Sequence, residues 1–204
     1  MYYHRQLEKI LIKAAEEFAC ITLYGARQTG KSTMVRTLFD GIEYVTLDHS
    51  RERLLASEDP ELFLQSHAVP LVIDEIQRAP ELMEAVKIRI DEAKMSSVRT
   101  GTKTGLMYIL TGPNTHEIRE KASETLAGRT AIIEVTSLSE SEKRQVEGND
   151  FFPDVHVLMS KKGKLAAKNR FEIFTEIYKG GMPEYWINEP DRNTFFENSC
   201  LSGS

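Results

Sequence analysis

Short apolar runs alternate with amphipathic stretches along most of the chain. The apolar runs predict strands at residues 20–24, 43–47, 70–75, 106–110 and 131–135. The stretches between them place apolar residues at helical spacing and predict helices at residues 31–39, 51–57, 60–66, 80–94 and 115–122. Strands that alternate with helices favour an α/β fold with a parallel sheet and right-handed crossovers.

The segments on either side of this alternation are also predicted to be helical. Within residues 4–18, apolar side chains recur at helical spacing, so we expect an amphipathic helix that packs on the edge of the sheet.

Residues 96–105 are polar and contain two glycines, which predicts a loop. The character of the sequence changes after residue 146. We therefore expect one domain over residues 1–146 and the start of a small helical C-terminal region over residues 147–204.

A glycine-punctuated loop follows the first predicted strand. Residues 25–32 read G-x-x-x-x-G-K-S and lead into a predicted helix, which is the context of a phosphate-binding loop. Backbone N–H groups of such a loop and the helix N-terminus would face phosphate oxygens. Lys31 would reach the β- and γ-phosphates, and the hydroxyl of Ser32 would ligate Mg²⁺. The predicted nucleotide-binding residues are Gly25, Ala26, Arg27, Gln28, Thr29, Gly30, Lys31, Ser32 and Thr33.

Two acidic residues end the third predicted strand. Asp74 and Glu75 directly follow the apolar run Leu71-Val72-Ile73, at the position of a Walker B site. Asp74 would hold Mg²⁺ through a water molecule and orient Ser32, and Glu75 would polarise the attacking water. The alternative is that both acids only cap or solvate the strand end, but the phosphate loop earlier in the chain favours the catalytic interpretation.

The fourth predicted strand ends in the polar residues Thr111 and Asn114. Either side chain could contact the γ-phosphate or the lytic water, and either could instead cap the helix that follows. The carboxyl ends of parallel strands meet at one edge of a sheet, where ligands bind. The phosphate loop, Asp48, Asp74, Glu75 and the end of the fourth strand all fall at such ends.

Composition and charge restrict the classes of protein. The chain has 204 residues, 41% of them hydrophobic and 28% charged, which suits one soluble α/β domain with a small appendage. The net charge of −5 argues against a dedicated nucleic-acid surface. A basic cluster, defined by Lys161, Lys162, Lys164, Lys168 and Arg170, has no interleaved aromatic residues, so a solvated face is favoured over a nucleic-acid site.

The location of the protein is predicted from its cysteines and from its apolar stretches. Cys20 and Cys200 lie at opposite ends of the chain, so a disulfide framework is not expected. The N-terminus has no apolar signal core, and no stretch approaches the ~18 apolar residues of a membrane span. We expect a cytoplasmic protein that does not contact membranes.

With these residues in place, the chain resembles the prokaryotic ATPases of the AAA_14 / DUF4143 group, a branch of the AAA+-like P-loop proteins. The matching segments occur in the family's order: "GARQTGKS", "YVTLD", "EDPELF", "LVIDEIQRAPEL", "ILTGPN", "ETLAGR" and "GGMPE". The resemblance implies a five-stranded parallel sheet in order 5-1-4-3-2 with helices on both faces. It also implies ATP and Mg²⁺ as ligands, and Glu75 as the catalytic glutamate.

The resemblance further implies that Arg129 lies near the phosphates as a sensor or arginine finger, where it would offset charge on the transferring phosphoryl group. A surface ion pair is the alternative for Arg129. The family usually has serine where Pro113 stands, so the resemblance does not decide which residue is the sensor. Its members are typically longer, and the chain reaches only the start of their DUF4143 region at "GGMPE".

The expected function is Mg²⁺-dependent ATP binding and hydrolysis that drives a conformational change on an unknown protein client. ATP and ADP are the expected ligands, self-association is left open, and nucleic acid is not an expected partner of this segment. The sequence lacks the guanine-reading pattern [NT]-K-x-D, which disfavours a GTPase.

Three alternatives remain open. The chain could be a nucleotide-binding switch or scaffold with little turnover, or a DNA-associated module that uses the basic cluster. A small-molecule kinase would use the same loop, but Glu75 directly after Asp74 suits water activation better than acceptor binding.

Overall fold

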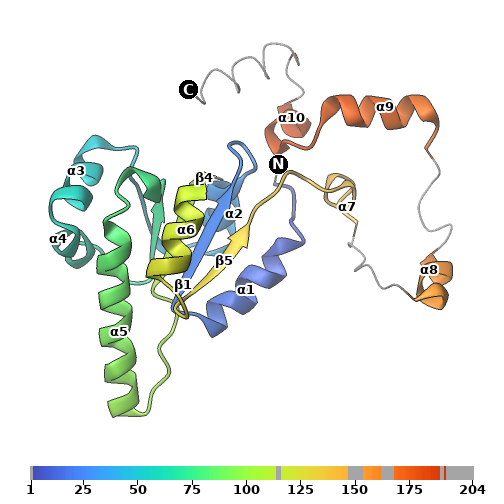
Figure 1. Cartoon of the computed structure of the whole chain (residues 1–204). Helices are drawn as coiled ribbons and strands as arrows, with labels where there is room; N and C mark the ends of the chain where they lie inside the picture. The colour runs from blue at the N-terminus through green and yellow to red at the C-terminus, as the bar shows by residue number, and fades with distance from the viewer. Residues whose placement is uncertain (1, 114–115, 147–153, 162–167, 189–190, 192–204) are drawn as a thin grey trace. The chain divides into compact units, whose positions relative to one another are not determined.

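The computed structural model describes residues 2–113, 116–146, 154–161, 168–188 and 191. The chain divides into two compact units, one formed by Leu7–Thr136 and the other by Met1–Gln6 together with Ser137–Ser204. Figure 1 shows the helices and strands of both. Within the described ranges, no helix is long and apolar enough to cross a membrane.

The first unit contains a five-stranded, entirely parallel sheet. The strands are β1 (Cys20–Gly25), β2 (Glu43–Thr46), β3 (Leu71–Asp74), β4 (Tyr108–Pro113) and β5 (Thr130–Glu134). Their order is β2-β3-β4-β1-β5, which is the expected order 5-1-4-3-2 counted from the opposite edge. The expected α/β fold, with a five-stranded parallel sheet in this strand order, is therefore confirmed.

Helices cover both faces of this sheet. The helices of the first unit are α1 (Leu7–Glu17), α2 (Lys31–Leu38), α3 (Ser50–Glu58), α4 (Pro60–Gln65), α5 (Leu82–Thr100) and α6 (His116–Thr125). A short 3-10 turn, η1 (Ile76–Arg78), follows β3. Side chains alternate between the two faces along each strand. As a result, Ile21 packs with α1 and α2 on one face, whereas Cys20 packs on the opposite face.

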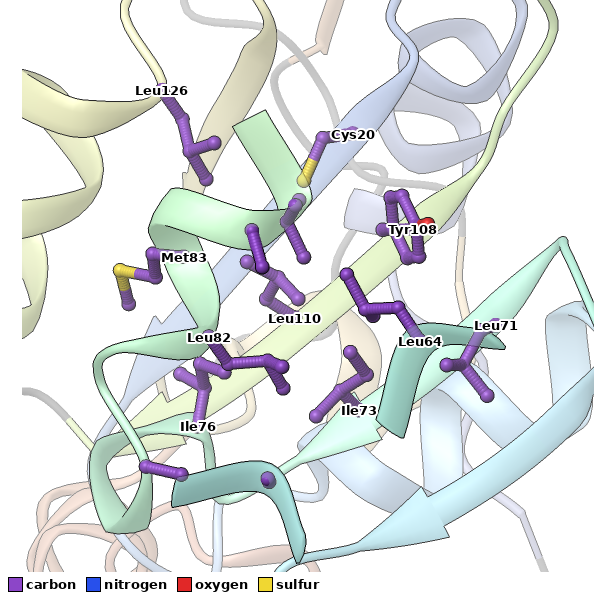
Figure 2. Packing of buried hydrophobic residues seen from close by; sticks show 14 of the residues in the cluster. Cys20, Leu64, Leu71, Ile73, Ile76, Leu82, Met83, Tyr108, Leu110 and Leu126 are labelled. Atoms are coloured by element: carbon purple, nitrogen blue, oxygen red, sulfur yellow. The ribbon is translucent and has the colours of Figure 1, made fainter. Parts of the chain in front are cut away.

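The larger core lies on the face covered by α3, α4, α5 and α6. Figure 2 shows how Leu71 and Ile73 of β3 and Tyr108 of β4 meet residues such as Leu64 of α4 and Leu82 of α5. Most of these side chains are fully buried, and each contributes about 1.5–3 kcal/mol of transfer free energy. This packing fixes the strands whose carboxyl ends carry the candidate site.

Two helices differ from their predictions. The helix α1 packs Leu11 and Ala14 against a face of the sheet, beside Ile21 and Leu23 of β1, and not against the sheet edge. The helix α5 continues to Thr100 into the predicted polar loop, because Gly101 is the first residue there to adopt the left-handed conformation that ends a helix (φ 69°). By contrast, Asp59 caps α4 as expected, since its carboxylate accepts the backbone N–H of Leu62 at 2.9 Å.

The second unit is helical in its described part. Its helices are α7 (Glu140–Lys143), α8 (Val155–Lys161), α9 (Arg170–Lys179) and α10 (Pro183–Asn188). The unit begins at Ser137, earlier than the expected boundary at residue 146, because Leu138 N donates to Gly181 O at 2.7 Å. Residues 1–6 belong to it as well, since Arg5 Nε lies 3.1 Å from Oε1 of the buried Glu142.

Candidate nucleotide-binding site

The phosphate loop connects β1 to α2 and has an unusual backbone. Gln28 and Gly30 adopt positive φ angles of 62° and 85°, which curl the chain ahead of the first turn of α2. The buried Thr29 stiffens this curl, because its hydroxyl donates to Ala26 O at 2.9 Å. Gly25 is required for a different reason: a Cβ there would lie 2.1 Å from the carbonyl oxygen of Val135.

Lys31 is folded into the loop that it follows. Its Nζ donates to Gly25 O and Ala26 O, both at 2.8 Å, and only 8% of the residue is exposed. Burial lowers the pKa of Lys31, while the nearby carboxylates of Glu75 and Asp74 oppose that shift. Lys31 also lines a cavity together with Gln28 and Gly30 of the loop, where phosphate oxygens would meet its ammonium group.

Asp74, at the end of β3, is the centre of a hydrogen-bonded cluster. Ser32 Oγ lies 3.2 Å from each of its carboxylate oxygens. Thr111 of β4 donates to Oδ1, and Tyr44 of β2 donates to Oδ2. Burial raises the pKa of Tyr44 to about 12, and the bond to Asp74 adds to that shift, so its hydroxyl remains a donor. Neighbouring strands on both sides thus hold one carboxylate beside the start of α2.

Glu75 follows Asp74 in the left-handed conformation (φ 61°, ψ 45°), and its carboxylate accepts a hydrogen bond from the amide of Gln77. Glu75 lines a cavity of about 270 Å³ together with Lys31, Ser32 and Pro113. A second cavity of about 560 Å³ is lined by Ser32 and Asp74 on the side of Tyr44 and Arg36. Glu75 therefore faces the space above the phosphate loop, beside the Ser32–Asp74 pair.

Most of the predicted site residues are brought together at the carboxyl edge of the sheet. The hydroxyl of Thr111 donates a hydrogen bond to the carboxylate of Asp74. Asp48 is at this edge too and pairs with Arg78 Nε at 2.7 Å. Asn114 lies outside the described residues.

Arg129 does not join this group within the chain. It directly precedes β5, and its carbonyl accepts the N–H of Cys20, the first residue of β1, at 3.2 Å. The phosphate loop leaves the other end of β1, whose six residues rise about 3.3 Å each. Arg129 Nε and Nη2 instead contact Asp91 of α5 at 2.7 and 2.9 Å. The expectation that Arg129 lies near the phosphates is not met, and the alternative ion pair is observed.

The contact with Arg129 also determines the partner that Asp91 has along α5. Lys87 and Asp91 are spaced to pair along α5, but Lys87 lies 3.4 Å from Glu84, and Asp91 forms its ion pair with Arg129.

Part of the basic cluster also lies outside the described residues. Within the described part, Lys168 is held by Glu140 and Glu176, so its charge is locally neutralised.

Three residues of the site were not predicted from the sequence: Tyr44, Arg36 and Gln77. The guanidinium of Arg36 lies 3.8 Å from the centre of the Tyr44 ring and steadies it. A tyrosine in an apolar strand is ordinary, so only the strand order, which sets β2 beside β3, could have indicated its contact with Asp74. Gln77 lies two residues after Glu75 in the sequence, but the direction in which its side-chain amide points depends on the turn η1.

Comparison with solved structures supports the fold. The chain is similar to the Walker-type ATPase PABY2304 of Pyrococcus abyssi, with a TM-score of 0.53, 15% identity and coverage of 98% of this chain and 72% of that one. Among curated proteins it is similar to two uncharacterized proteins, Rv2008c of Mycobacterium tuberculosis and Mb2031c of Mycobacterium bovis. Each is 27% identical over 130 residues, which are 63% of this chain and 27% of the relative's length.

The chain thus spans about a quarter of these two mycobacterial proteins. The model of the AAA domain family AAA_14 matches residues 17–143, a range that contains the phosphate loop, the Ser32–Asp74 pair and Glu75 and ends before "GGMPE". On this match, the chain belongs to the AAA domain family AAA_14.

Proposed function

We propose that the chain binds ATP with Mg²⁺ and hydrolyses it. The observation that carries this proposal is the meeting of Ser32 Oγ with both carboxylate oxygens of Asp74, at 3.2 Å, beside a buried Lys31. A phosphate loop alone would support only anion binding. A hydroxyl and a carboxylate next to it, with a second carboxylate facing the same cavity, support phosphoryl chemistry.

The loop and Lys31 would bind the phosphates. Backbone N–H groups around Gly30 and the N-terminus of α2 provide positive partial charge, and the Lys31 ammonium provides a full one. Its Nζ donates to two loop carbonyls and would turn from them toward phosphate oxygens in the cavity that Lys31 lines. These groups would stabilise negative charge that develops on the phosphoryl oxygens.

Ser32 and Asp74 are a suitable donor set for Mg²⁺, which prefers oxygen ligands and is bound through one or two protein groups plus substrate phosphates. When bound, the ion neutralises charge on the transferring phosphoryl group. Tyr44 and Thr111 occupy the outer sides of the Asp74 carboxylate and restrict its orientation toward Ser32.

Glu75 would orient and deprotonate the attacking water. Glu75 directly follows Asp74, and it lines the cavity that Lys31 and Ser32 also line, which supports this role. We infer that hydrolysis would drive a conformational change on an unknown client. Adenine is preferred over guanine in this proposal because the sequence lacks the guanine-reading pattern.

A nucleotide switch with little turnover is the second candidate. It is favoured by the placement of Arg129, which is paired with Asp91 at the opposite edge of the sheet from the phosphate loop. A chain that relies on another molecule for its catalytic arginine would bind ATP strongly and hydrolyse it slowly alone.

Steady-state ATP hydrolysis with Mg²⁺ tests the proposal. Glu75→Gln should lower kcat by on the order of 100-fold or more while ATP binding is kept, since it removes the base and leaves the loop. Lys31→Ala should lose ATP binding. Glu92→Gln makes the same change on the exposed surface of α5 and should behave as wild type. ATP binding without turnover in the wild type would favour the switch, and equal rates in wild type and Glu75→Gln would contradict the role of Glu75.

A further inference from the structure

Gln77 is fixed in place by the turn that carries it. Backbone N–H groups of Arg78 and Ala79 donate to the carbonyls of Glu75 and Ile76 at 3.0 and 3.1 Å, which closes η1. Ile76 and Ala79, on either side of Gln77, are fully buried in the larger core. A side chain on such an anchored turn can hold a neighbour within a narrow range of positions.

The amide of Gln77 is oriented by Glu75. Its nitrogen donates to Oε2 of Glu75, whereas the opposite orientation would set the amide oxygen against a carboxylate. Among the residues that the structure describes, Oε1 of Gln77 is buried and has no hydrogen-bond partner. A buried acceptor without a partner is unfavourable, and such local exceptions concentrate at functional sites. Gln77 thus donates to Glu75 although this orientation leaves its own Oε1 without a hydrogen-bond partner among the described residues.

The end of β4 makes room for this amide. A Cβ on Gly112 would lie 3.0 Å from Ile118 Cδ1 and 3.2 Å from Gln77 Oε1, so a side chain at position 112 would press on both. The glycine thus lets Gln77 lie against the carboxyl edge of the sheet, with its nitrogen toward Glu75. Glu75, for its part, has a positive φ, a conformation that non-glycine residues keep only where neighbouring contacts determine it.

We propose that Gln77 is a positioning residue that orients the carboxylate of Glu75 for water activation. This inference rests on the proposed ATP hydrolysis. A glutamate side chain has several rotatable bonds, and the amide bond to Oε2 limits the orientations that its carboxylate adopts in the cavity beside Lys31. Gln77 acts through Glu75, so its loss lowers kcat and leaves the phosphate loop and the Ser32–Asp74 pair in place.

Gln77→Met tests this inference, because methionine keeps the length of the side chain and removes both polar ends. We expect kcat to fall about 10- to 100-fold with an unchanged KM for ATP. Gln77→Glu replaces the donor by a second carboxylate next to Glu75 and should reduce kcat at least as much. Gln65→Met is the matched control: Gln65 Nε2 donates to Glu61 at 3.2 Å on the exposed surface of α4, so the same kind of bond is removed away from the site.

The outcomes separate this inference from the proposed function. Wild-type kcat in Gln77→Met, in a protein whose wild type turns over, would overturn the role of Gln77 alone. Equal losses of kcat and of ATP affinity in Gln77→Met would also overturn it, because they indicate general damage to the site. A wild-type chain that binds ATP without hydrolysing it would overturn both proposals.

Discussion

Arg129 and Asp91 form a two-point ion pair between the start of β5 and the helix α5, with nitrogen–oxygen distances of 2.7 and 2.9 Å. The bond from Arg129 lowers the pKa of Asp91, so the carboxylate remains ionised. Because the pair lies at the amino edge of the sheet, we expect Arg129→Ala to keep the ATP turnover of this chain. Steady-state hydrolysis at several protein concentrations, beside wild type, measures this.

Lys31→Ala is the comparison variant for that experiment, since it should lose turnover at every concentration. A different result for Arg129→Ala would also be informative. If the wild-type specific rate rises with protein concentration and this rise is lost in Arg129→Ala, Arg129 acts on the nucleotide of a neighbouring copy. That result would contradict the prediction, and it would mean that Arg129 completes the catalytic site of a neighbouring copy of the chain.

Gly25→Ala should destabilise the first unit and disturb the phosphate loop. The new Cβ would lie 2.1 Å from the carbonyl oxygen of Val135. The backbone fixes the positions of both atoms, so neither can rotate away. Relief requires β1 and the end of β5 to separate, at a cost of about 1–3 kcal/mol or more. Thermal unfolding measures the loss of stability, and ATP binding should weaken in the same variant.

Gly105→Ala is the matched control for this substitution. Among the described residues, no heavy atom lies within 4 Å of a Cβ built at Gly105. The control should therefore melt as wild type does. If Gly25→Ala melts at the same temperature as Gly105→Ala, the close approach of β1 and Val135 is not a constraint on the loop.

The strand ends were the most predictable part of the molecule. Period and length of the apolar runs identified the five strands, and the parallel topology that follows from their alternation with helices sets all their carboxyl ends at one edge. The contact between Ser32 and Asp74 was predictable on this basis, although 42 residues separate them. The polar residues at the strand ends indicate the chemistry of the site, and the parallel sheet brings these residues close together.

Contacts that depend on side-chain direction could not be predicted in this way. Arg129 follows a glycine and precedes a strand, and nothing in that pattern indicates that its side chain turns toward α5. The bond from Tyr44 to Asp74 requires β2 to lie beside β3 in the observed register, which pairs Thr46 with Asp74. Gln77 depends on the turn η1 in the same manner. The contacts of such residues can be recognised only when the backbone structure is known.

Tyr44→Phe should raise the Mg²⁺ concentration that half-maximal ATP turnover requires. The hydroxyl of Tyr44 donates to Oδ2 of Asp74, and its loss frees that carboxylate to rotate away from Ser32. Outer partners of metal ligands typically contribute about 10- to 100-fold to metal affinity or activity, and we expect a change of that size. Titration of turnover with Mg²⁺ at saturating ATP measures it.

Tyr178→Phe, on the exposed surface of α9 in the other unit, is the control for the loss of a phenol hydroxyl. It should leave the Mg²⁺ titration unchanged. An unchanged titration in Tyr44→Phe would mean that Thr111 and Ser32 suffice to orient Asp74. A loss of turnover that no Mg²⁺ concentration restores would point to a defect in packing between β2 and β3.

The second unit should lose stability in acid through Glu142. Burial raises the pKa of this carboxyl, but hydrogen bonds from the N–H groups of Ser139 and Gln6 and the charge of Arg5 outweigh it, so the pKa is lowered overall. A lowered pKa in the folded state means that stability is present above the unfolded value of about 4.3 and is lost as the pH falls from there through the folded pKa.

Trp186, the single tryptophan of the chain, lies in α10 of the same unit and reports its unfolding by fluorescence. We expect the melting midpoint of wild type to fall as the pH is lowered below about 4.3. Glu142→Gln should melt lower at neutral pH, by the equivalent of about 1–3 kcal/mol, and should depend less on acid, because it has no charge to lose. Glu184→Gln, an exposed change in α10, should keep the wild-type pH dependence. If Glu142→Gln loses stability in acid as steeply as wild type, another carboxylate of the unit must cause the effect, and the assignment to Glu142 is wrong.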